Sequence, residues 1–170
     1  IKITVFPARQ LGDDRQLFEQ LQQGSLDMGL ISAAPMGSTA PFMTALQLPF
    51  LFNTWDQYLK VMRSDAANNL LKGLENNGVK VLAVPNGGLR YLVSVAKPIM
   101  KVEDMKGMKV RVAETPLHVD IFKALNASPT PMPYGEISSG LQNKVIDGLE
   151  MDLPAMQVAN HYDGAKHVTL

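Results

Sequence analysis

Short segments whose apolar residues alternate with polar ones are separated along this chain by segments of helical periodicity. The alternating segments predict strands at residues 1–5, 26–30, 79–83, 91–95 and 108–112. Helix starts are predicted after Gly12, at Thr54, after Thr115, at Glu136 and at Asp152 or Leu153. Strands that alternate with helices predict an α/β fold, because the helices can then cover the faces of a sheet.

Local patterns add detail to this prediction. Residues 54–57 have the spacing of a capping box, and the helix that they start carries its apolar stripe as far as Leu70. Three prolines within residues 129–133 forbid a helix, so the chain must reach Tyr134 in an extended form. Residues 145–148 predict a short strand that ends in a turn.

The chain is expected to form two lobes. Residues 86–89 interrupt regular structure and predict a hinge. Residues 1–88 should then form most of a first α/β lobe and residues 89–170 most of a second. The chain begins inside an alternating segment and ends in an apolar one, so we expect a piece of a longer protein, truncated at both ends, whose missing strands complete both sheets.

Charge balance and residue types exclude several classes of function. Sixteen basic residues balance sixteen acidic ones, so the chain lacks the basic surface that binds nucleic acid or an anionic membrane. No apolar run is long enough to insert across a bilayer. The chain has no cysteine, and its three histidines lie in separate places and are predicted to be on helix surfaces or at caps. The sequence therefore points to no cofactor and no metal site.

Catalytic motifs are also missing from the sequence. It contains no P-loop, no dinucleotide-binding glycine fingerprint, no zinc-protease motif and no nucleophile elbow. Acids such as Glu136 and Asp147 are not placed beside a nucleophile. The sequence therefore favours a protein that is not an enzyme.

Arg111 is the residue that most suggests a ligand. It lies near the carboxyl end of the predicted strand 108–112. In open α/β sheets, ligands bind beyond this end of the strands. A guanidinium group there offers a rigid fork of donors that suits a carboxylate or a phosphate. An arginine on a solvated strand face is the alternative that this pattern leaves open.

Several motifs occur in an order and spacing that resemble one known family. They are QLGD at 10–13, GSLD at 24–27, LPF at 48–50, GLR at 88–90, KPI at 97–99, DMKGMKVRV at 104–112, ASPTPM at 127–132, Glu136, and residues 141–150. On these motifs, which extend over essentially the whole chain, it resembles the solute-binding proteins of TRAP (tripartite ATP-independent periplasmic) transporters.

The resemblance implies a type II-like periplasmic-binding-protein architecture, a venus flytrap with a ligand cleft between two α/β lobes. It implies a protein of the periplasm that captures a small organic acid and delivers it to the TRAP membrane subunits. Within such a protein, Arg111 forms the main ion pair with the ligand carboxylate and Arg90 assists it. Tyr134 packs against the ligand.

Further positions follow from the same resemblance. Asp14 contacts the polar end of the ligand from the opposing lobe, and the loop with Ser32 and Ala33 lines the same wall. Glu150 and Met151 complete the predicted ligand-binding residues.

Departures from the family pattern bear on the ligand. Met151 stands where the family commonly has an asparagine that supports the carboxylate or the key arginine, and a thioether cannot donate a hydrogen bond. A neighbouring donor, an ordered water or a less polar ligand must then compensate. Ser32 stands where sialic acid binders tend to have an acid, which disfavours sialic acid. Asp14 would repel a second carboxylate unless that carboxylate lies elsewhere or Asp14 is protonated, which favours a sugar acid.

The sequence leaves other ligands and other functions open. A C4-dicarboxylate or a 2-keto acid is the alternative ligand. A ligand-sensing effector domain or an enzyme on the same bilobal fold is the alternative function. A third possibility is an α/β domain whose cleft binds a protein.

Overall fold

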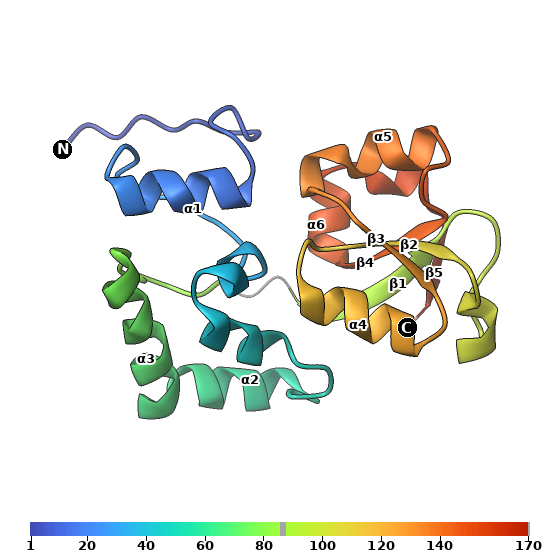
Figure 1. The fold of residues 1–170 in the computed structure, drawn as a ribbon, viewed down its shortest axis with the longest axis horizontal. Coiled ribbons are helices and arrows are strands. Elements are labelled where there is room, and N and C mark those ends of the chain that lie inside the picture. The colour runs from blue at the N-terminus through green and yellow to red at the C-terminus, as the bar shows by residue number, and fades with distance from the viewer. Residues whose placement is uncertain (86–87, 170) are drawn as a thin grey trace. The chain divides into compact units, whose positions relative to one another are not determined.

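The computed structural model describes residues 1–85 and 88–169, apart from the side chains of residues 35 and 38. The chain divides into two compact units, Ile1–Val84 and Pro85–Leu170, which Figure 1 shows as a ribbon coloured along the chain. The predicted hinge at 86–89 falls partly on residues 86 and 87, which lie outside the described residues, and the predicted boundary after residue 88 stays a prediction.

The first unit consists of helices and loops. Its α-helices are α1 (Asp14–Gln23), α2 (Trp55–Met62) and α3 (Asp65–Lys72). Its 3-10 helices are η1 (Pro35–Ser38), η2 (Pro41–Gln47) and η3 (Gly73–Asn77). Its core contains the buried side chains of Phe18, Met36, Ala40, Met43 and Leu74.

Helix α1 confirms the start and stop signals of the sequence. The carboxylate of Asp13 accepts hydrogen bonds from the backbone N–H groups of Arg15 (3.0 Å) and Gln16 (2.9 Å). The side chain of Gln16 in turn accepts from the Asp13 N–H, which completes a capping box. Gly24 ends the helix in the left-handed conformation, with φ of 70°.

The strands predicted at 1–5, 26–30 and 79–83 are wrong, because residues 1–84 contain no strand. Alternation predicts a strand only where a neighbouring strand accepts its hydrogen bonds and another layer covers its apolar face. These segments have no neighbouring strand within the first unit. Val79 and Val81 pack against the core of this unit, but Ile3 and Leu30 remain 77% and 80% exposed.

The single helix predicted from Thr54 to Leu70 is two helices. Helix α2 ends at Met62, and α3 begins at Asp65. The Ser64 hydroxyl accepts a hydrogen bond from the N–H of Ala67 and so caps a new helix. A serine within an apolar stripe can interrupt a helix in this way, because its side chain competes for the backbone N–H groups.

The second unit contains a five-stranded mixed sheet with the order β3-β2-β4-β1-β5. Its strands are β1 (Arg90–Ser94), β2 (Lys109–Val112), β3 (Ser128–Pro131), β4 (Gly148–Asp152) and β5 (His167–Thr169). Strand β2 runs parallel to β3 and β4, whereas β1 is antiparallel to β4 and β5. The sheet confirms the strands predicted at 91–95 and 108–112 and the extended proline segment.

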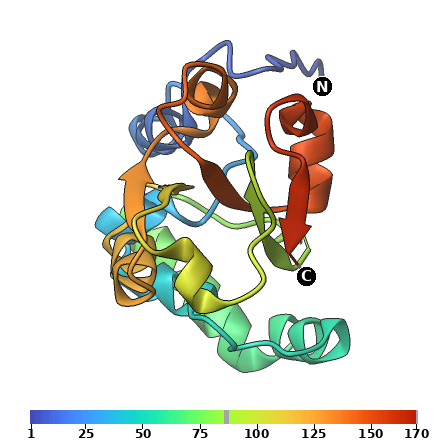
Figure 2. The same ribbon diagram turned by 90° about the vertical axis from the view of Figure 1, so that its right-hand side faces the viewer.

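Helices cover both faces of this sheet (Figures 1 and 2). The α-helices are α4 (Pro116–Ala124), α5 (Ile137–Gln142) and α6 (Leu153–Val158), and the 3-10 helices are η4 (Val102–Met105), η5 (Tyr134–Glu136) and η6 (His161–Asp163). Thr115 caps α4 and Asp152 caps α6, as predicted.

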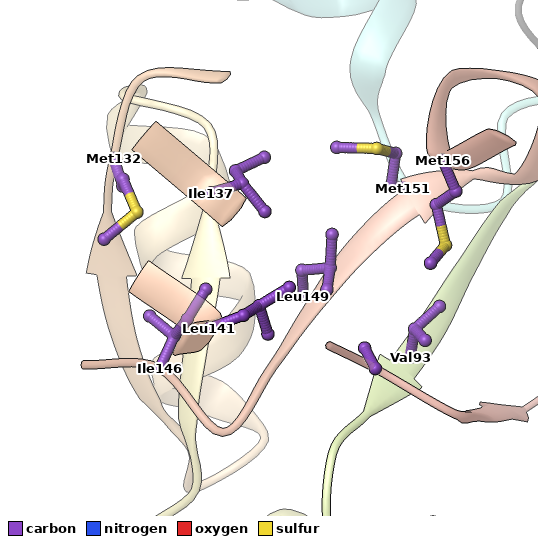
Figure 3. Packing of buried hydrophobic residues seen from close by; sticks show 9 residues of the cluster. Val93, Met132, Ile137, Leu141, Ile146, Leu149, Met151 and Met156 are labelled. Carbon is purple, nitrogen blue, oxygen red and sulfur yellow. The ribbon is translucent and has the colours of Figure 1, made fainter. Parts of the chain in front are cut away.

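The two faces have separate apolar cores. On the α4 face, Val110 and Val112 of β2 pack with Phe122 of α4. On the other face, Leu149 and Met151 of β4 pack with residues of α5 and α6 (Figure 3). Side chains that alternate along a strand are therefore buried on both sides, as in other sheets with two covered faces.

Burial on both faces explains why the bounds of β4 differ from those predicted. The strand predicted at 145–148 actually occupies Gly148–Asp152. Residues 148–151 are all buried, so the two-residue alternation that marks a one-sided strand is missing.

Among the described residues, no helix has the length and apolar character needed to cross a membrane.

Gly148 allows the close approach of β4 to β1. A Cβ atom at this position would lie 2.4 Å from the carbonyl oxygen of Val93 and 2.5 Å from Cε of Met108. We expect Gly148→Ala to lower the free energy of unfolding by about 1–3 kcal/mol, because the strands must move apart. Denaturant unfolding of the full-length protein measures this.

Gly29→Ala is the control for that substitution. The nearest atom to its new Cβ would be Cδ1 of Leu21 at 3.3 Å, the end of a flexible side chain. We expect a change within about 0.5 kcal/mol. Equal stability of the Gly148→Ala and wild-type proteins would contradict the tight β1–β4 contact.

Candidate functional site

The predicted ligand residues of the second unit gather at the edge of the sheet where β2 and β4 end. Arg111 of β2 pairs with Leu149 of β4 in parallel register, and Arg90 of β1 pairs with Asp152. Since β2, β3 and β4 are parallel, their carboxyl ends meet at this edge, which is where α/β sheets bind ligands.

Arg111 is buried rather than placed on a solvated strand face. It is 5% exposed, and its Nε and Nη2 atoms donate to the carbonyl oxygen of Met132 at 2.9 and 2.7 Å. Its position between Val110 and Val112 directs it to the α5–α6 face. These two hydrogen bonds to one carbonyl oxygen fix the orientation of the guanidinium group.

Arg90 has a carboxylate partner in the same unit. Its Nε atom pairs with Oε2 of Glu150, and its Nη2 atom donates to Oε1 at 2.8 Å and to the main-chain oxygen at 3.0 Å. Oδ2 of Asp152 lies 4.0 Å from Nη1. Burial acts to lower the pKa of Arg90, but the two carboxylates outweigh it, so the pKa lies above its ordinary value.

The cross-strand register places this ion pair on the α4 face. Glu150 pairs with Leu92, which packs in the α4-face core. Glu150 and Arg90 therefore belong to that face, whereas Arg111 belongs to the other. The structure brings the two predicted arginines to one edge but places them on opposite faces of the sheet.

His118 lies near the ion pair on the α4 face. It is 7% exposed, and Oγ1 of Thr115 accepts from its backbone N–H and lies 3.2 Å from its Nδ1. Burial lowers the pKa of His118; the charge of Glu150 opposes this shift, and those of Arg90 and Arg111 add to it. The cap of α4 is Thr115 and His118 is buried, so the prediction that His118 is a helix-surface or capping residue is wrong.

Tyr134 and His161 lie on the Arg111 face. The Tyr134 hydroxyl donates to the carbonyl oxygen of Ala155 at 2.9 Å, and its ring packs edge to face with that of His161, with centroids 5.4 Å apart. His161 is 3% exposed, not on a helix surface as predicted. Burial lowers its pKa, and the charge of Arg111 lowers it further.

A separate polar cluster occupies the first unit. Oδ2 of Asp14 accepts hydrogen bonds from the hydroxyl of Ser32 at 2.8 Å and from its N–H at 3.4 Å. Oδ1 of Asp14 lies 3.3 Å from Nη1 of Arg9. Ala33 packs against the apolar core of this unit. The structure therefore joins two predicted residues, Asp14 and Ser32, and adds Arg9.

The sequence did not indicate Arg9 as a site residue, and it predicted His118 and His161 only as helix-surface or capping residues. Arg9 has a φ of 60° in the turn before α1, a conformation that no composition or spacing signal indicates. The histidines are buried by helices that pack against the sheet, and the sequence around an isolated histidine does not indicate whether it is buried.

Met151 is 2% exposed and packs in the α5–α6 core. The described residues contain no group of three potential metal ligands from His, Cys, Asp and Glu.

Comparison with known proteins gives one consistent result. A family model described as bacterial extracellular solute-binding protein, family 7, matches residues 1–170. A solute-binding protein of Chromohalobacter salexigens is 32% identical over 170 residues, which are 100% of this chain and 51% of that protein.

Solved structures of other proteins are also similar to this chain. The sugar acid binding protein of Advenella mimigardefordensis in complex with galactonate is 31% identical, with a TM-score of 0.96, over 99% of this chain and 55% of that one. A TRAP periplasmic solute-binding protein from Xanthobacter autotrophicus with bound β-D-galacturonate is 36% identical, with a TM-score of 0.95, over 100% of this chain and 57% of that one. The chain thus spans about half the length of the relatives that it matches.

The two buried histidines predict a pH-dependent stability. Their folded pKa values lie below the ordinary value of 6.5. As the pH falls through 6.5 towards the lowered values, the unfolded chain binds protons that the folded chain does not, so stability is lost. The slope is at most about 1.4 kcal/mol per pH unit for each histidine.

Denaturant unfolding of the full-length protein between pH 7.5 and 5.5 measures this loss. His118→Gln and His161→Phe should each flatten the slope. A wild-type stability that is constant over this range would contradict the prediction.

Proposed function

Because the chain belongs to family 7 of the bacterial extracellular solute-binding proteins, the TRAP solute-binding family, we propose that the protein containing it captures a small organic acid in the periplasm. It delivers that acid to the membrane subunits of a TRAP transporter, and it performs no catalysis. A sugar acid is the favoured ligand, and a C4-dicarboxylate or 2-keto acid is the alternative.

The observation that carries this proposal is a buried arginine oriented by a backbone carbonyl oxygen at the carboxyl edge of the sheet. Arg111 is 5% exposed and donates to the Met132 carbonyl oxygen. Desolvating a ligand carboxylate is costly unless a cation and hydrogen bonds replace its water. A guanidinium already oriented by the protein meets this need with little further loss of side-chain freedom.

Arg90 has a different part in the proposal. Its fork is engaged with Glu150, so its charge is partly balanced in the same unit. We assign to Glu150 the role of holding Arg90, and to Arg90 a supporting electrostatic role rather than that of main anchor. Met151 offers apolar contact and no hydrogen bond.

The preference for a sugar acid rests on two observations. Relatives with 31% and 36% identity have galactonate and β-D-galacturonate bound in their solved structures. In the first unit, Asp14 and Ser32 offer a carboxylate and a hydroxyl that suit ligand hydroxyl groups. Arg9 balances part of the Asp14 charge, so repulsion of a second carboxylate is a weaker argument than the sequence alone indicated.

Thermal melting of the full-length protein with a panel of acids tests the anchor. The panel contains D-galactonate, D-galacturonate, succinate, pyruvate and neutral galactose. A ligand at one hundred times its dissociation constant should add about 2.7 kcal/mol to the free energy of unfolding. Arg111→Ala should weaken binding by about 2–5 kcal/mol, because it removes the partner of a desolvated carboxylate.

The control is Arg15→Ala, which removes an exposed arginine that pairs with Glu19 on the surface of α1. It should bind the acid as the wild type does. If galactose stabilises the wild-type and Arg111→Ala proteins equally while the acids do not, Arg111 is not a carboxylate anchor and the proposal fails.

The first-unit cluster gives a second prediction. Ser32→Ala and Asp14→Asn should each weaken D-galactonate binding about fivefold, because each removes roughly one hydrogen-bonding group worth about 1 kcal/mol. Isothermal titration measures the affinities. Ser25→Ala removes a loop hydroxyl that donates to the Gln20 carbonyl oxygen and is the matched control. Unchanged affinity in both variants would remove this cluster from the ligand site.

A further inference from the structure

The side chain of Tyr134 is fixed at two points by residues that follow it in the chain. Its hydroxyl donates to the carbonyl oxygen of Ala155 in α6 at 2.9 Å. Its ring meets that of His161 in η6 edge to face, with centroids 5.4 Å apart and planes at 64°. The first contact fixes the end of the ring and the second fixes its tilt, since edge-to-face pairs have a preferred geometry.

His161 is itself oriented by helix α5. Its Nδ1 atom lies 3.1 Å from the Ser138 hydroxyl oxygen. The hydroxyl can donate to a neutral imidazole, whose proton then resides on Nε2. Phenylalanine could supply the same ring edge to Tyr134, but it could not accept this hydrogen bond. The histidine therefore adds an orientation that an apolar ring would lack.

This orientation has a cost. Among the residues that the structure describes, Nε2 of His161 is buried and has no hydrogen-bond partner. An unsatisfied buried nitrogen destabilises a fold, and phenylalanine would avoid it. A histidine at this position is explained if the orientation of its ring supports the neighbouring ligand site.

The tyrosine ring is linked to the anchoring arginine through two residues of backbone. Arg111 donates to the carbonyl oxygen of Met132, and Tyr134 follows two residues later, after Pro133. Both side chains lie on the α5–α6 face. A change in the ring's direction would therefore act close to the bound carboxylate.

We propose that His161 and Ser138 are positioning residues that hold the Tyr134 ring in the orientation in which it packs against the apolar C–H groups of the bound acid. This inference rests on the proposed function, together with the contact between Tyr134 and the ligand that the family resemblance implies. Neither positioning residue touches the ligand, so both act through Tyr134 alone.

Isothermal titration of the full-length protein with D-galacturonate tests this. His161→Phe keeps a ring edge, and Ser138→Ala removes only a hydroxyl; each should weaken binding about fivefold, as expected for the loss of one hydrogen bond. In a Tyr134→Ala background, neither change should weaken binding further, because the residue through which they act is gone.

A ligand-free measurement makes the test independent of the acid chosen. In protein with isotopically labelled tyrosine rings, the Tyr134 NMR signal is identified by its loss in Tyr134→Phe. It should shift or broaden in both His161→Phe and Ser138→Ala. The signal of Tyr58, which packs with Phe52 and Trp55 in the first unit, should stay unchanged.

The outcomes separate the two proposals. If Arg111→Ala leaves acid binding intact, the proposed anchor fails, and the NMR signal of Tyr134 still decides whether His161 and Ser138 hold the ring. If Arg111→Ala abolishes binding while His161→Phe and Ser138→Ala bind as the wild type, or weaken binding additively with Tyr134→Ala, the positioning role is overturned. Should His161→Phe fail to fold, Ser138→Ala decides alone.

Discussion

The hydrogen bonds from the Arg111 guanidinium to the Met132 carbonyl oxygen are the contact on which the second unit's candidate site depends. They join strand β2 to the segment that follows β3, at the edge where parallel strands end. Two donors of one guanidinium share this acceptor, which fixes the orientation of the arginine side chain. A cation that is buried and oriented in advance can bind a desolvated carboxylate at a smaller entropic cost.

Arg90 and Arg111 lie on opposite faces of the sheet and have different partners. On the α4 face, Arg90 is held by Glu150 near His118, and on the opposite face Arg111 lies near His161. Strand alternation produces this division, since neighbouring positions on one strand point to opposite faces. Burial and arginine charge both disfavour protonation of the two histidines.

Much of the site was predictable as a set of residues but not as a set of contacts. The motif around Arg111 identified it as a candidate anchor, and the sheet register then placed Arg90 and Glu150 at the same edge. Their pairing could not be read from sequence, because the two residues are sixty positions apart. Arg9 was missed for a similar reason, since its contact with Asp14 depends on a left-handed turn.

The sequence by itself determined the features that depend on near neighbours in the chain. The Asp13 cap of α1, the Thr115 cap of α4 and the extended proline segment all follow from local hydrogen bonds and backbone sterics. Tertiary structure alone decided which alternating segments became strands and on which face each polar side chain was buried. A strand requires a partner, and the burial of Arg111 requires a second covered face, and both come from residues distant in sequence.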